Sequence, residues 1–162
     1  MPPGAREGVD LVVQFLNTVD LEDASDVLDD AGAWTVWCAD RGLVPGRLDR
    51  VRAVRDGLRD VVDGGPVRLP PVHLVLSPGT DGVELTAGSA DAVERILVEV
   101  AVLVATGAFA RVKLCPADDC RWAFVDRSRN RSRTWCDMDA CGNRAKVRTF
   151  RARHQDGAGA HA

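Results

Sequence analysis

The 162-residue sequence lacks the features of several protein classes. No apolar run reaches the roughly 18–20 residues that cross a membrane, and the longest candidate, 96–106, is interrupted by Glu99. The opening residues, MPPGAREGVD, have no apolar core of the kind that a secretion signal needs. We therefore expect a cytoplasmic protein with no membrane partner.

The sequence also lacks the usual signatures of catalysis. Its three histidines form no metal-ligand cluster, no glycine-rich phosphate loop occurs, and no nucleophile stands beside a recognisable base. We therefore expect that the protein is not an enzyme. Hydrophobic residues make up 46% of the chain and charged residues 28%, which is typical of a folded globular protein.

Lysine is scarce, since Lys113 and Lys146 are the only two, and arginine supplies almost all of the positive charge. The net charge of −3 is unevenly distributed along the chain. Residues 111–153 contain twelve Lys and Arg against five acidic residues, a net charge of +7, and the rest of the chain carries −10. A basic segment on an acidic body indicates a polyanionic partner, although a solvated charged face explains the bias equally well.

The first two thirds of the chain predict a mainly helical body with one small β-hairpin. Two short alternating runs, 72–76 and 82–86, flank the turn-forming sequence SPGTD and predict the hairpin. Ser89 is expected to cap the helix that follows it. Helices are predicted where apolar residues recur every three or four positions, at 9–20, 31–41, 48–62 and 90–106.

Four of the five cysteines lie in the last third of the chain. Cys115-x4-Cys120 and Cys136-x4-Cys141 are matched pairs separated by fifteen residues, a layout typical of a four-cysteine zinc site. Thiolates are better zinc ligands than the nearby carboxylates, and no position is left open for water, so a structural site is expected. Two disulfides or an iron–sulfur cluster remain alternatives at this point. Cys38 stands apart and is expected to be a core residue.

The segments between and after the cysteine pairs predict a compact module. In the insert, 122–125 and 133–135 are predicted to pair as a short hairpin, and a helix is predicted after Cys141. A knuckle, a hairpin and a helix whose first turn carries the last ligand make a treble-clef arrangement. The predicted fold class is therefore α+β, with a mainly helical N-terminal domain that includes a small β-hairpin, followed by a treble-clef-like zinc finger.

The basic and polar residues of this module are candidates for nucleic-acid binding. Arginine and lysine neutralise phosphates, arginine can pair with guanine, and asparagine can pair with adenine. Asn143 has a competing interpretation, which is that it caps the helix or hydrogen-bonds a zinc sulfur, and Arg144 can also pack locally. The candidates are Arg127, Ser128, Arg129, Asn130, Arg131, Arg133, Asn143, Arg144, Lys146, Arg148 and Arg151.

These motifs resemble one known family. The sequences FVDRSRNRSRTWC (124–136) and CGNRAKVR (141–148), with Cys115–Pro116 and Cys120 before them, resemble the CGNR zinc-finger family of bacterial transcription regulators. FLNTVD (15–20) resembles the Asn-Thr motif that opens the family's usual N-terminal domain, a stress-associated ABATE-like α/β unit. The resemblance implies one structural zinc ion on the four cysteines and implies binding to DNA.

The predicted organisation follows from these observations. Residues 8–110 form the ABATE-like domain, 111–154 form the CGNR zinc finger, and 155–162 form a disordered tail. The predicted function is that of a DNA-binding transcription regulator whose body senses a small ligand or forms a homodimer. A homodimer is expected because one short helix covers only a few base pairs. An RNA- or ribosome-associated module and a protein-interaction module are the alternatives.

Overall fold

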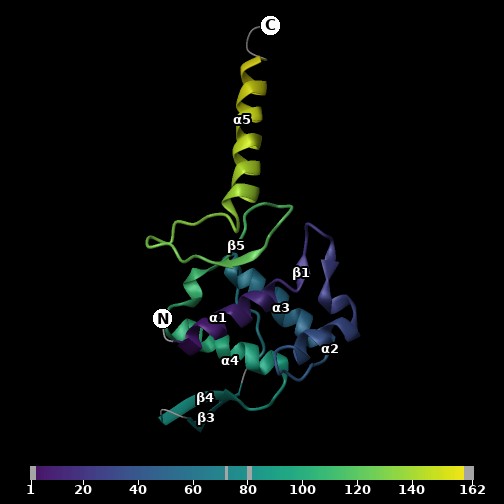
Figure 1. The fold of residues 1–162 in the computed structure, drawn as a ribbon, viewed down its shortest axis with the longest axis vertical. Coiled ribbons are helices and arrows are strands. Elements are labelled where there is room, and N and C mark those ends of the chain that lie inside the picture. The colour runs from purple at the N-terminus through teal and green to yellow at the C-terminus, as the bar shows by residue number, and fades with distance from the viewer. Residues whose placement is uncertain (1–2, 72, 80–81, 159–162) are drawn as a thin grey trace.

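The computed structural model describes residues 3–71, 73–79 and 82–158. Helix α5 rises from one end of a helical body, and a β-hairpin lies at the opposite end (Figure 1). The hairpin consists of β3 (Leu74–Gly79) and β4 (Gly82–Ala87). The helices are α1 (Pro3–Leu16), α2 (Ala31–Ala39), α3 (Leu48–Val62), α4 (Ala92–Ala105) and α5 (Asn143–Ala158).

The core of the body surrounds α1, which packs against α3 and α4. Phe15 of α1 is buried against Trp34 of α2, with 6.2 Å between the ring centroids. The helical spacing of apolar residues in α3 buries one face of that helix, as predicted. Cys38 is fully buried in this core, also as predicted, and burial raises the pKa of its thiol to about 11.

The body differs from the predicted elements in two places. The chain after α1 forms a small hairpin of β1 (Val19–Asp20) and β2 (Ser25–Asp26), followed by a 3₁₀ turn, η1 (Val27–Asp29). The predicted cap Ser89 is wrong, because Asp91 caps α4. The Asp91 carboxylate accepts hydrogen bonds from the first free N–H groups of the helix, whereas the Ser89 hydroxyl donates to Glu94 at 2.8 Å.

The β3–β4 hairpin is confirmed, but it reaches further than the sequence predicts. Residues 77–79 of the predicted turn belong to β3, whereas the strand begins at Leu74 and not at the predicted 72. Residues 72 and 80–81 lie outside the described residues. Leu76 pairs with Leu85, and Pro78 pairs with Val83. One face of the hairpin is therefore apolar, and its Leu76 and Val83 side chains are 70% and 72% exposed.

The hairpin of the C-terminal module has a different partner strand from the predicted one. Strand β6 (Ala123–Val125) pairs with β5 (Val112–Leu114), and residues 133–135 form no strand, so the predicted pairing of 122–125 with 133–135 is wrong. The N–H of Arg133 instead donates to the buried Asp126 carboxylate at 3.0 Å, which turns the chain back toward the start of its loop.

The body and the module share one hydrophobic core. Val112 of β5 and Ala123 of β6 are buried in the same cluster as the helices of the body, so the predicted division between 110 and 111 is not a packing boundary. At the other end of the module, α5 continues to Ala158, into the predicted disordered tail 155–162, and residues 159–162 lie outside the described residues. Within the described ranges, no helix has both the length and the apolar character that a bilayer span requires.

Candidate metal centre

The four cysteines of the predicted zinc site converge. Cys115 follows β5 and Cys120 precedes β6, so the paired strands bring both sulfurs to one end of the hairpin. Cys141 belongs to the π-helical turn Met138–Gly142 that leads into α5, and Cys136 lies in the loop before it. All four Sγ atoms lie within 4.8 Å of one another.

The sulfur geometry fits a tetrahedral zinc ion. The Sγ atom of Cys136 lies 3.6 Å from that of Cys120 and 3.7 Å from that of Cys141. Four sulfurs about 2.3 Å from a zinc ion are about 3.8 Å apart, whereas a disulfide bond is about 2.05 Å long. The four side chains are thus spaced as zinc ligands, and because all four positions are thiols, the site has the closed ligand set of a structural zinc.

Hydrogen-bond donors surround these sulfurs. The Cys115 sulfur accepts from the backbone N–H groups of Ala117 and Cys136, and Arg144 donates from Nη2 to the Cys141 sulfur at 3.2 Å. Zinc with four thiolates carries a net charge of −2, and these donors offset part of it. The hydrogen bond to Cys141 is the leading cause that raises the pKa of Arg144.

The turn that carries Cys141 is closed by its own side chains. Asp137 accepts hydrogen bonds from the N–H groups of Asp139 and Ala140 at 2.7 and 2.8 Å, and Asn143 donates from Nδ2 to the Asp139 carbonyl oxygen at 3.0 Å. Asn143 therefore has a local structural role, but its contact is with the turn and not with a zinc sulfur or the first turn of α5 as predicted. A Cβ atom on Gly142 would lie 2.6 Å from the Met138 sulfur.

The loop between the cysteine pairs folds around an ion pair whose carboxylate is buried. We call residues 127–133 the arginine loop. Asp126 is fully buried and accepts from Lys113 Nζ at 2.6 Å and from the Ser128 hydroxyl at 2.6 Å. Lys113 also donates to the carbonyl oxygens of Arg131 and Arg133, at 2.7 and 2.9 Å. Burial raises the pKa of the Asp126 carboxyl, but the hydrogen bonds from Lys113 and Ser128 outweigh it and keep the pKa well below its usual range.

Two predicted nucleic-acid residues of the loop are used to hold its shape. The Ser128 hydroxyl binds Asp126 and accepts from the N–H of Ser132 at 2.9 Å. The Arg133 guanidinium lies 5.0 Å from the ring centre of Phe124 and donates from Nε to the Trp135 carbonyl oxygen at 2.9 Å and from Nη2 to the Cys136 carbonyl oxygen. Arg133 thereby connects the loop to the metal site.

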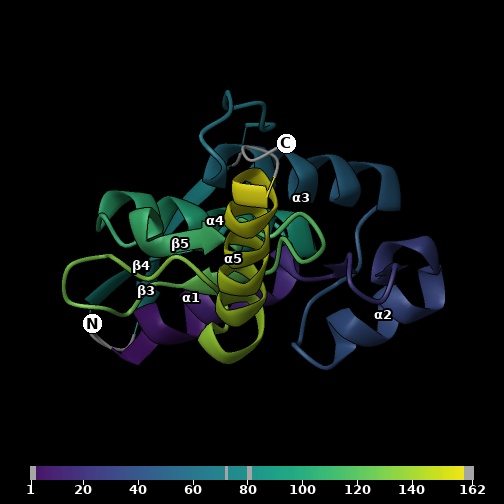
Figure 2. The ribbon, with the colours of Figure 1, turned by 90° about the horizontal axis from the view of Figure 1, so that it is seen from above.

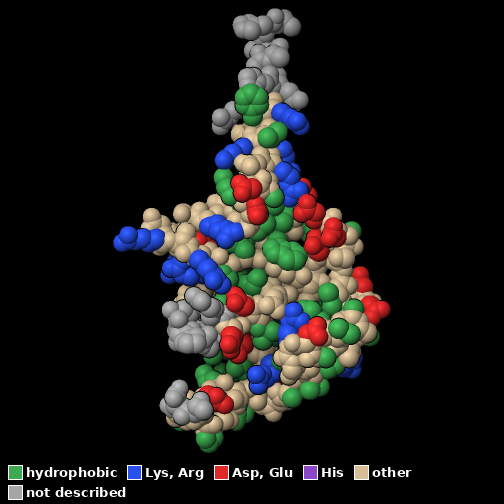
Figure 3. Space-filling model, in the orientation of Figure 1, with side chains coloured by type: hydrophobic (Ala, Val, Ile, Leu, Met, Phe, Trp, Pro, Cys, Tyr) green, Lys and Arg blue, Asp and Glu red, His purple; other side chains and the backbone are tan. Residues whose placement is uncertain are grey.

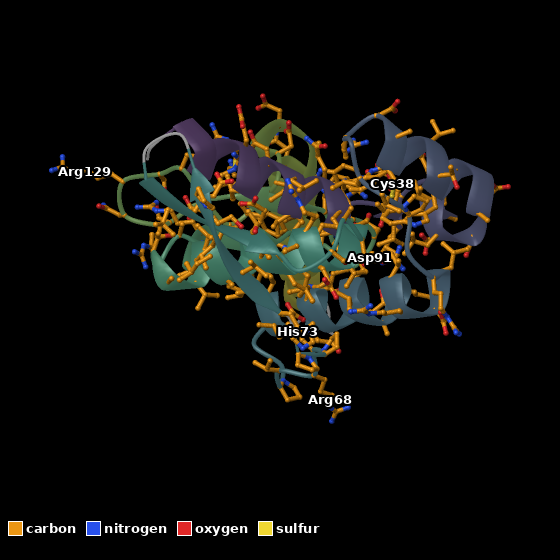
Figure 4. The ribbon with its side chains drawn as sticks, turned by 90° about the horizontal axis from the view of Figure 1, so that it is seen from below. Cys38, Arg68, His73, Asp91 and Arg129 are labelled. Carbon is orange, nitrogen blue, oxygen red and sulfur yellow. The ribbon has the colours of Figure 1, made fainter. Side chains whose placement is uncertain are left out.

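The other loop residues point outward. Arg129 extends away from the body (Figure 4), and Arg129, Asn130 and Arg131 are exposed, with no side-chain hydrogen bond or ion pair to any residue that the structure describes. Arg127 is also exposed, and its Nη2 atom lies 3.2 Å from Asp10 of α1. The loop therefore presents three arginines on a backbone that buried groups fix.

The arginines of α5 form a second surface. We call Arg144, Arg148 and Arg151 the helix stripe, because their spacing places them on one face of the helix. Arg144 lies 2.9 Å from Glu22, and Arg148 lies 3.8 Å from Asp119. Acidic side chains accordingly flank the base of α5, whereas Lys and Arg gather on the arginine loop and along α5 (Figure 3).

The predicted nucleic-acid residues are thus not brought together into one patch. Seen from above, α5 stands over the body and the arginine loop extends to one side (Figure 2). The helix stripe is partly neutralised by the acidic residues beside it, and Lys146 does not belong to the stripe, because it lies half a turn from Arg148. Among the described residues, Arg129 and Arg131 of the loop are exposed cations without an ion pair, and so are Lys146 and Arg151 of α5.

Three residues that organise this region were not predicted as site residues. Asp126 is the single acidic residue in the run FVDRSRNRSRTWC, an exception that could have identified it as the centre of the loop. Lys113 precedes the first cysteine by two positions and is one of two lysines in the chain. Asn17 lies in the motif FLNTVD and binds the backbone of Ala123. A distant partner of this kind leaves no local sequence signal.

One comparison identifies the module. Residues 111–154 match the family model of the CGNR zinc finger. The match includes all four cysteines, the arginine loop and the first turns of α5, and it leaves the N-terminal ABATE-like assignment as a prediction. No curated protein matches the chain. Residues 111–154 of this chain therefore are a CGNR zinc finger with one structural zinc site, formed by Cys115, Cys120, Cys136 and Cys141.

Proposed function

We propose that the finger binds DNA through the arginine loop and that the protein is a cytoplasmic, non-enzymatic transcription regulator. The proposal depends on the geometry of the arginine loop. Arg129 and Arg131 project from a backbone that is fixed by Lys113 and its partner, the buried Asp126. Because the loop is already ordered, binding requires less loss of conformational entropy than a flexible arginine segment would require.

The charge of the loop suits a phosphate backbone. Arg127 pairs with Asp10 at the surface, where an ion pair contributes about 0–1 kcal/mol, so a phosphate can replace that carboxylate. Three arginines that each neutralise one phosphate would contribute about −2.7 to the slope of log affinity against log salt. Asn130 lies between two of them and is placed to contact a base edge.

Helix α5 adds a second element to this proposal. It stands clear of the body (Figure 1), and a helix fits the major groove of DNA, which is about 12 Å wide. We further infer a treble-clef arrangement, in which a knuckle between β5 and β6 supplies two sulfurs and the turn before α5 supplies Cys141. Zinc would then fix the direction of α5 relative to the arginine loop.

DNA selection from a random pool tests the proposal. The holo-protein is compared with the triple variant Arg127→Ala/Arg129→Ala/Arg131→Ala. A matched control removes three exposed arginines from the body instead, as Arg47→Ala/Arg50→Ala/Arg68→Ala. We expect the wild type and the control to enrich the same motif and the loop variant to lose it. Equal enrichment by all three proteins would refute the role of the loop.

The same arginines have the chemistry to bind RNA. Competition between duplex DNA and homopolymer RNA for the holo-protein decides between the two polyanions, and preferential displacement by RNA would replace the DNA proposal with an RNA- or ribosome-associated role. We further propose that the body forms a homodimer or senses a small ligand.

A further inference from the structure

A cavity of about 390 Å³ lies where the body meets the arginine loop. Val9 of α1, Ala108 and Val125 of β6 give it an apolar wall, and Arg111 and Arg127 give it a basic rim. Its volume lies at the lower end of the range for small-molecule pockets, which is about 300–1,000 Å³. The cavity is therefore large enough for a ligand much larger than a simple ion.

The charges around this cavity select an anion. Among the described residues, its lining includes three arginines and no acidic residue. Arg111 is fixed, because its Nη1 atom donates to the carbonyl oxygens of Asp126 and Ser128, both at 3.0 Å. Arg129 contributes the stem of its side chain, since its guanidinium extends into solvent (Figure 4). Arg111 and Arg127 thus supply the positive charge next to the apolar wall.

We propose that this cavity binds a small organic phosphate that carries an apolar ring beside its phosphate group, which is the chemistry of a mononucleotide. A phosphate offers three acceptor oxygens and up to two negative charges, which suits two neighbouring guanidinium groups better than a single carboxylate does. The ring would lie against Val9, Ala108 and Val125. This site is separate from the zinc site and does not require that the protein bind DNA.

The site would also connect the body to the finger. Arg127 pairs with Asp10 at 3.2 Å, and a phosphate in the cavity competes with that carboxylate for the same guanidinium. A bound ligand would hold Arg127 at the cavity and leave fewer loop arginines for a nucleic acid. The ligand would therefore lower the affinity of the finger for a polyanion.

Calorimetric titration of the zinc-loaded full chain tests the proposal without any DNA present. The probes are AMP, adenosine and inorganic phosphate. We expect AMP to bind one to one, and adenosine and phosphate to bind at least about tenfold more weakly, because each offers only half of the recognised chemistry. Failure of AMP to saturate the protein at about 5 mM, or phosphate binding as tight as that of AMP, would overturn the proposal.

Two variants separate the cavity from the general charge of the loop. Ala108→Trp fills the cavity and leaves every charge in place, and Arg127→Gln removes one rim charge without enlarging a side chain. The matched control is Arg131→Gln, which removes a loop charge outside the cavity. We expect the first two variants to weaken AMP binding about tenfold and the control to change it less than about twofold. An equal loss in Arg127→Gln and Arg131→Gln would show that AMP binds by diffuse charge and would refute the cavity.

Discussion

Asn17 holds the backbone of Ala123 with both ends of its side-chain amide. The N–H of Ala123 donates to Asn17 Oδ1 at 2.7 Å, and Asn17 Nδ2 donates to the Ala123 carbonyl oxygen at 2.9 Å. The next residue, Thr18, accepts from Arg55 of α3 at 3.2 Å. The motif FLNTVD thus fixes β6 of the finger and α3 of the body at the end of α1.

This clamp predicts a large effect of a small substitution. Asn17→Ala removes the partners of both the N–H and the carbonyl oxygen of Ala123, a residue that is only 1% exposed. We expect the free energy of unfolding to fall by about 2–3 kcal/mol in urea denaturation. Gln14→Ala, which removes one hydrogen bond of an exposed side chain, is the control and should cost less than about 1 kcal/mol. An Asn17→Ala protein as stable as the control would show that the clamp contributes little.

The loop centre gives a second prediction. Asp126→Asn keeps the size of the side chain but removes the charge that faces Lys113. We expect faster hydrogen exchange in 127–133, an unchanged zinc content, and DNA affinity lowered about five- to tenfold because the loop must order on binding. Asp49→Asn makes the same charge change on the exposed surface of α3 and should leave all three unchanged. Loss of zinc from Asp126→Asn would mean that Asp126 supports the metal site rather than the loop.

Removal of the metal gives a third prediction. The core that the body shares with the module indicates which part of the module should stay folded without zinc. Zinc binding contributes about 10–16 kcal/mol in small fingers, so a strong chelator or Cys136→Ser should release residues 126–151 to rapid hydrogen exchange. Because Val112 and Ala123 are buried with the helices of the body, β5 and β6 should stay protected together with α1 and α4. Cys38→Ser, a cysteine change outside the metal site, should retain one zinc per chain. Unfolding of the whole body on chelation would contradict this division.

The buried ion pair of the body predicts how stability depends on pH. The Asp26 carboxylate accepts hydrogen bonds from Arg55 at 2.6 and 2.9 Å. Burial raises the pKa of Asp26, but the hydrogen bonds from Arg55 and from the Leu28 N–H outweigh burial, so the pKa is lowered. A lowered pKa stabilises the protein above the unfolded-state value of about 4, and this contribution is lost as pH falls through the folded-state value.

The corresponding variant is Asp26→Asn, which leaves the buried Arg55 with only the exposed carboxylate of Asp56 as a charged partner, at 3.0 Å. It should cost about 3 kcal/mol at pH 7. Measured by thermal unfolding, the difference between wild type and variant should shrink below about pH 4. A difference that stays constant across that range would show that the charge of Asp26 is not what stabilises the fold.

The sequence predicts best where its signal is local. Helix α3 spans Leu48–Val62, the same residues that its apolar spacing indicates, because one buried face alone determines it. The metal ligands were also predictable, since two matched cysteine pairs have few other uses in one module. The β3–β4 hairpin follows from two alternating runs around a turn sequence.

The remaining features depend on contacts between distant residues. Strand β5 has three residues, too few for a pattern, and it exists because it pairs with β6 and buries Val112 in the body. The path of the arginine loop depends on the buried carboxylate of Asp126. A count of charges along the sequence does not distinguish this buried acidic residue from an exposed one. The sequence alone does not indicate which arginines are paired, because their partners are distant in the chain. Arg127 pairs with Asp10 and Arg144 pairs with Glu22, and both acidic residues lie in the body.

We propose that the arginine loop is the main surface for a polyanion, and the salt dependence of DNA affinity decides whether it is. The measurement compares the slope of log affinity against log salt for the holo-protein and for Arg127→Ala/Arg129→Ala/Arg131→Ala. If each of the three arginines neutralises one phosphate, the slope of the variant should be shallower by about 2.7. Identical slopes, or a wild-type affinity that does not change with salt, would contradict the claim.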